Sequence, residues 1–77
     1  MQLRIKNNND APLLVILEPW ATEHVVAPQD FIQLKPYGNI PNGAFFTFEH
    51  HSAFITVTPE WNGALVHVYS STGKLID

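Results

Sequence analysis

Residues 12–20 read PLLVILEPW: five aliphatic residues follow one proline and end at Glu18, just before a second proline. Consecutive aliphatic side chains suit a buried helix and a buried strand equally well, so periodicity does not choose between them. The second proline decides in favour of a strand. Pro19 lacks a backbone donor and holds Glu18 in an extended conformation, which leaves a run too short for a stable helix and of ordinary length for a strand. The run therefore predicts a buried β-strand at residues 13–18.

The rest of the chain consists of short β-rich segments separated by turn-forming residues. No window has the apolar spacing of a helix, and six prolines interrupt the chain. Further strands are predicted at residues 2–6, 24–26, 31–35, 45–49, 54–58, 65–69 and 75–76. Residues 36–43 are rich in proline, glycine and asparagine, and we expect them to be irregular and to cross between two sheets.

Seven or eight short strands at this spacing are typical of an all-β fold. We predict that residues 1–77 form a single domain, a small antiparallel β-sandwich or a partly open barrel. Two strands follow the same tripeptide, Asn-Gly-Ala, at residues 42–44 and 62–64, and each Asn-Gly is expected to form a hairpin turn. Their shared phase places Phe46, Phe48, Val66 and Val68 inward and Thr47, Glu49, His67 and Tyr69 outward.

The size of the chain favours self-association. A domain of 77 residues buries only about 60% of the surface that its unfolded chain exposes, which leaves little net stability. Small domains often add disulfides or thiolate-bound metal ions, but this chain has no cysteine. We therefore expect a homodimer or docking on a protein partner, through strand pairing or an apolar face that includes Tyr69.

The charge balance argues against other partners. Four basic and seven acidic side chains give a net charge of −3, with no basic cluster that would suit a phosphate backbone. We therefore expect no nucleic-acid binding. Residues 1–6 lack the apolar core of a signal peptide, and no stretch is long enough to span a bilayer. We expect no membrane partner and a cytoplasmic location.

The histidines suggest a metal site of the cupin kind, because Glu49 stands beside two of them. Ligands on one face of a strand are two residues apart, whereas His50 and His51 are adjacent and project to opposite faces. His67 and Glu49 are expected on the outer surface, away from His50. We predict no metal and no cofactor; the candidate ligands are His50, His51, His67 and Glu49.

No arrangement of residues predicts catalysis. The chain has no cysteine nucleophile, its serines fall in predicted turns, and its carboxylates are isolated from one another. It also lacks a glycine-rich phosphate loop. We predict that the protein is not an enzyme.

The large aromatic side chains are the remaining candidates for a binding surface. Tyr37, Trp61 and Tyr69 fall in loops or on an outer face, where planar rings stack on sugars or anchor a protein. Trp20 is expected to fold back as a lid over one end of the core. Trp61, at a turn tip, fits either role.

The aliphatic strand closing on Glu18-Pro19-Trp20, followed by a short strand, a proline turn and a third strand, resembles a group of small uncharacterised bacterial β-sandwich proteins. The turn Ser-Thr-Gly-Lys at residues 71–74 and the short last strand belong to the same likeness. Ala21 stands where the resemblance leads us to expect glycine. The strand order is also similar to immunoglobulin-like and cupredoxin-like sandwiches, but cupredoxin copper sites need a cysteine. The resemblance implies a fold and no activity.

These observations support three hypotheses for function. The first is a non-enzymatic protein-interaction or self-association module. The second is a carbohydrate-binding module that uses Trp61, Tyr37 and Tyr69 as stacking platforms. The third is a cupin-like metal-binding protein that uses the histidines.

Overall fold

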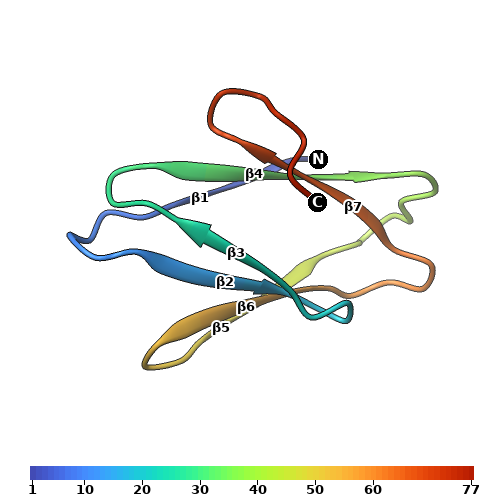
Figure 1. The fold of residues 1–77 in the computed structure, drawn as a ribbon. Helices are drawn as coiled ribbons and strands as arrows, with labels where there is room; N and C mark the ends of the chain where they lie inside the picture. Colours follow the sequence, from blue (N-terminus) through green and yellow to red (C-terminus); the bar gives the residue numbers. More distant parts are fainter.

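The computed structural model describes the whole chain and contains only strands and their connections (Figure 1). The strands are β1 (Leu3–Lys6), β2 (Leu13–Leu17), β3 (Thr22–Val26), β4 (Phe31–Tyr37), β5 (Phe46–His50), β6 (Phe54–Pro59) and β7 (Leu65–Ser70). They form a three-stranded sheet of order β1-β4-β7 and a four-stranded sheet of order β3-β2-β6-β5. The two sheets make two layers, so the predicted all-β sandwich is confirmed.

The aliphatic run forms an interior strand of the larger sheet. β2 pairs antiparallel with β3 and parallel with β6, and every other strand pair is antiparallel. The expectation of a purely antiparallel sandwich is therefore corrected at one pair. Parallel neighbours cannot be joined by a tight turn, and here the chain passes through β3, β4 and β5 before β6 lies beside β2.

The core lies between the facing sides of the two sheets. Alternate residues of β2, such as Val15 and Leu17, point into it. The buried apolar side chains are Ile5, Val15, Leu17, Val26, Ile32, Leu34, Val57, Val66 and Val68. The predicted inward orientation of Val66 and Val68 is thus confirmed, and Phe46 packs against the core from its margin.

Phe48 differs from its predicted burial, because its side chain is 50% exposed. It lies opposite the fully buried Val57 and therefore shares the inner face of the sheet. β5 is the last strand of the four-stranded sheet, and the facing sheet has one strand fewer. The inner face of β5 is consequently left partly uncovered.

The end of β4, the two Asn-Gly turns and the segment after β7 differ from the sequence-based expectations. β4 extends through Tyr37 and therefore includes Pro36. Pro36 is tolerated because β1 pairs with β4 only as far as Leu34, so β7 is the one neighbour of β4 at this position. Gly43 and Gly63 have the expected positive φ, but their turns join the two sheets and are not hairpins. Leu75 forms only an isolated bridge with Tyr69 instead of a last strand.

Candidate functional site

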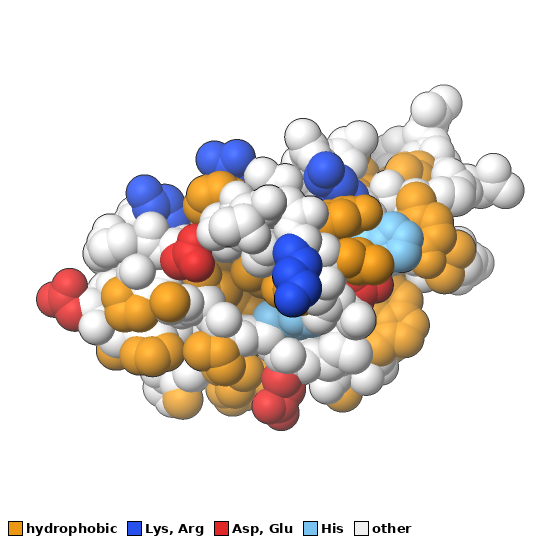
Figure 2. Space-filling view, turned by 45° about the horizontal axis from the view of Figure 1, so that its top comes forward, with side chains coloured by type: hydrophobic (Ala, Val, Ile, Leu, Met, Phe, Trp, Pro, Cys, Tyr) orange, Lys and Arg blue, Asp and Glu red, His pale blue; other side chains and the backbone are white.

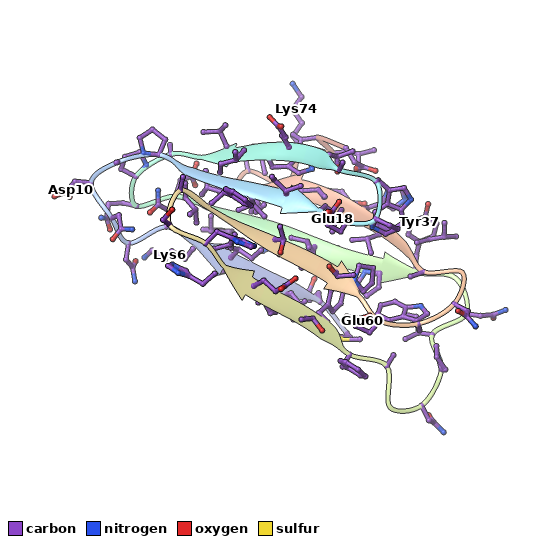
Figure 3. All side chains as sticks on the ribbon, turned by 90° about the horizontal axis from the view of Figure 1, so that it is seen from below. Lys6, Asp10, Glu18, Tyr37, Glu60 and Lys74 are labelled. Carbon is purple, nitrogen blue, oxygen red and sulfur yellow. The ribbon has the colours of Figure 1, made fainter.

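β5 is an open edge of the four-stranded sheet. It pairs with β6 on one side, and Figure 3 shows no strand beyond it on the other. Phe48, in the strand, and Phe45, just before it, are 50% and 58% exposed. The only charged side chain of the strand other than histidine is Glu49. The edge therefore exposes aromatic side chains beside one carboxylate and carries none of the lysines that protect many edge strands.

The hydrogen bonds between β5 and β6 show which backbone groups of this edge are free. His51 N–H donates to Phe54 C=O, and Glu60 N–H donates to Phe45 C=O, each at 2.9 Å. Hydrogen-bonded and non-hydrogen-bonded pairs alternate along an antiparallel ladder, so the odd-numbered residues of β5 face β6. The residues whose N–H and C=O groups point to the open side are Phe46, Phe48 and His50.

Of the other three edges, one is covered, one is shorter, and the third has fewer outward backbone groups. Residues 74–77 lie along β7, where Ile76 N–H donates to Val68 C=O at 2.8 Å and Val68 N–H donates to Asp77 Oδ1 at 3.1 Å. β1 is only four residues long and carries Arg4 and Lys6. β3 remains open, but the same alternation leaves only two of its strand residues, Glu23 and Val25, directed outward.

The predicted aromatic platform is divided between two parts of the molecule. Trp61, half-buried, packs edge-on against Phe46, with ring centroids 5.4 Å apart, and its Nε1 is buried without a partner. Tyr37 and Tyr69 instead lie on the outer face of the three-stranded sheet, where they alternate with inward side chains of β4 and β7. The three rings are therefore not gathered on one surface.

Basic side chains lie among hydrophobic ones on the outer face of the three-stranded sheet (Figure 2). Arg4 lies 4.0 Å from the ring centre of Phe31, and the Lys35 ammonium lies 4.8 Å from that of Tyr69. His67 stacks on Tyr37 at 4.1 Å with an interplanar angle of 9°. Each of these neighbours covers one face of its ring.

The candidate metal ligands stay apart. His50 and His51 point to opposite faces at the end of β5, and His51 stacks on Phe54. His67 lies on the other sheet, with its Nδ1 3.1 Å from Asp77 Oδ2. Glu49 is exposed on the outer face of β5. No three histidine, aspartate or glutamate side chains are grouped to hold a metal ion.

His24 is a buried histidine that the sequence did not single out. Its side chain points inward from β3, only 7% of the residue is exposed, and its Nε2 has no hydrogen-bond partner. Burial lowers the pKa of His24 from 6.5, and the nearby charge of Asp77 only partly opposes this. The imidazole is therefore neutral at pH 7.

One pocket, of about 200 Å³, opens at the end of the sandwich where β2 and β4 finish. Glu18 and Tyr37, labelled in Figure 3, mark this end. The lining includes Leu17, Leu65 and Val66, the rings of Trp20 and Tyr37, and Asp77. Trp20 is 44% exposed, which corrects the expectation of a buried lid. Its replacement by alanine should cost less than the roughly 3–5 kcal/mol of a buried aromatic.

Comparison with known proteins gives no relative for this chain. No family model, curated protein or solved structure matches it. The likeness to small bacterial sandwich proteins, and to immunoglobulin-like and cupredoxin-like strand orders, therefore stays a prediction. None of the chain forms a helix with the length and apolarity needed to cross a membrane.

Proposed function

We propose that this domain is a non-enzymatic self-association module whose strand β5 pairs with β5 of a second copy. The observation that carries the proposal is the run of alternate residues Phe46, Phe48 and His50, whose backbone groups all face the open side of an edge without lysine. An unpaired edge of this kind is a template for another strand.

The edge is complementary to itself. In an antiparallel pair centred on Phe48, that residue lies opposite Phe48 of the second copy, and Phe46 lies opposite His50. These are the residues with outward N–H and C=O groups, so every free backbone group of β5 gains a partner. Thr47 lies opposite Glu49 of the second copy, and the two Glu49 carboxylates are not paired with each other. The result is a two-fold symmetric dimer with a continuous eight-stranded sheet.

The side chains support the same register. Phe46, Phe48 and His50 share one face of β5, so pairing brings their rings into a row across the two-fold axis. Aromatic pairs across antiparallel strands stabilise a sheet by roughly 0.2–1 kcal/mol each. Phe48, half-exposed in one copy, would be covered by its counterpart.

Sedimentation equilibrium tests the proposal directly. We expect the protein to dimerise and the Phe48→Lys variant to remain monomeric. The Cα atoms of the two residues at position 48 would be about 5.5 Å apart, so the two lysine side chains would repel each other. Val25→Lys is the matched control, since Val25 is an exposed apolar residue of the other open edge. It should still dimerise.

Amide hydrogen exchange adds a site-specific test. The N–H of Phe48 should exchange rapidly at low protein concentration and be protected at high concentration, since only the second copy gives it an acceptor. A mass fixed at 8.7 kDa up to about 1 mM, or a dimer that Phe48→Lys leaves intact, would contradict the proposal. A cytoplasmic location and the lack of enzymatic activity stay predictions from composition.

A further inference from the structure

The end pocket has an unusual combination of lining groups. Two aromatic rings, Trp20 and Tyr37, border it together with the aliphatic side chains of Leu65 and Val66. Its only charged group is the carboxylate of Asp77, and no lysine or arginine lines it. Lys35, two residues before Tyr37, is held over the ring of Tyr69. The pocket therefore combines aromatic and aliphatic side chains with the hydroxyl of Thr22 and one carboxylate.

The carboxylate of Asp77 is fixed and ionised. Its Oδ1 accepts a hydrogen bond from Val68 N–H at 3.1 Å, and its Oδ2 lies 3.1 Å from His67 Nδ1. Burial acts to raise the pKa of Asp77, but hydrogen bonds from His67 and the backbone, together with the charge of His67, outweigh it and leave the pKa below its usual value. The negative charge is present at neutral pH.

The ring of Tyr37 is also held in position. The imidazole of His67 stacks on one of its faces at 4.1 Å and is itself tied to Asp77. Trp20 approaches from the turn after β2, on the other sheet. Two ring systems from different sheets and one carboxylate thus converge on a single small space.

We propose that this pocket binds a small organic cation, a quaternary ammonium group such as trimethylammonium. Such a cation is attracted to the faces of tryptophan and tyrosine and to a nearby carboxylate, and its methyl groups are compatible with the leucine and valine side chains. A volume of about 200 Å³ suits one such head group and is small for a larger ligand. An anion would be repelled by the charge of Asp77.

The test compares choline with 3,3-dimethylbutan-1-ol, which has the same shape without the charge. Trp61→Phe leaves Trp20 as the only indole, so that its fluorescence reports on the pocket. We expect choline to bind saturably and about tenfold or more tightly than the neutral alcohol, because the rings and the carboxylate act on the charge. Equal binding of the two would show an apolar pocket and overturn the proposal, as would binding of glucose but not choline.

Two variants separate the charge from the fold. Asp77→Asn keeps a side-chain oxygen that can accept the hydrogen bond from Val68 N–H, and it should weaken choline binding about tenfold. The control is Asp10→Asn, which removes an exposed carboxylate in the β1–β2 loop and should leave binding unchanged. Tyr37→Leu should also weaken binding, with thermal unfolding used to confirm that each variant is folded. Unchanged binding in Asp77→Asn and Tyr37→Leu, or no binding by the parent, would contradict the proposal. The titration is repeated in Phe48→Lys, so the result is independent of self-association.

Discussion

The buried side chain of Asn7 forms hydrogen bonds to three backbone groups. It lies in the loop after β1 and is 1% exposed. Its Nδ2 donates to Val26 C=O at 3.0 Å and to Ala11 C=O at 2.8 Å, and its Oδ1 accepts from Asn9 N–H at 3.0 Å. One amide therefore ties the β1–β2 loop to the end of β3.

We expect Asn7→Ala to lower the free energy of unfolding by roughly 2–3 kcal/mol, because the buried partners of the amide lose their hydrogen bonds. The neighbouring Asn8→Ala is the control. Asn8 is exposed, and only its backbone carbonyl is engaged, by Gln29 Nε2. It should change stability by less than about 0.5 kcal/mol. Urea denaturation of both variants makes the comparison, and equal losses would show that the Asn7 amide is not the cause.

His24 gives the domain a pH dependence of known sign. Its pKa is lowered in the folded state, so between that value and 6.5 the unfolded chain binds more protons. The stability contributed by the neutral imidazole is complete above about pH 6.5 and is lost as the pH falls through this window. Asp30 and Asp77 have pKa values below 3.8 and therefore act only in more acidic solution.

The melting temperature should consequently fall when the pH is lowered from about 8 to about 5. His24→Gln should flatten this dependence, while His50→Gln, at an exposed site on β5, should keep it. Differential scanning calorimetry at several pH values gives the answer. A fall of the same size in His24→Gln would assign the effect to another group.

At the scale of elements, the turn between β2 and β3 contains a strained position. Ala21 has φ of 58°, in the left-handed region where a Cβ atom is unfavourable. We expect Ala21→Gly to raise the free energy of unfolding by about 1 kcal/mol, because glycine removes the strain and outweighs its own extra unfolded-state entropy. Ala27→Gly, at an exposed position without a positive φ, should instead be neutral or destabilising. Chemical denaturation of the two variants distinguishes these outcomes.

The elements that the sequence predicted are those whose signals are local. The aliphatic run predicts β2, and the alternation of apolar and polar residues predicts that Val66 and Val68 point inward. Both patterns depend on neighbouring residues alone. The parallel pairing of β2 with β6 depends on residues far apart in the chain, which no local pattern encodes. The exposure of Phe48 likewise depends on its place in the last strand of the larger sheet, which its own sequence pattern does not encode.

The candidate sites illustrate the same limit at the scale of the molecule. Tyr37 was identified from the sequence, but its proximity to Trp20 and Asp77 requires both sheets and the segment after β7 to be in place. The importance of β5 as an edge likewise depends on the strand order. The small size of the chain predicts association without showing where it occurs.

Self-association should make the stability of the whole molecule depend on its concentration. If unfolding separates the two copies, mass action favours the folded dimer as the protein concentration rises. The melting temperature of the parent should therefore increase over a hundredfold rise in concentration. Phe48→Lys should melt at one temperature throughout, because its folded and unfolded states contain the same number of chains. Val25→Lys should follow the parent. A parent melting temperature that does not change across this range, while sedimentation shows a dimer, would mean that the copies separate before they unfold and that β5 pairing adds nothing to the stability of the fold.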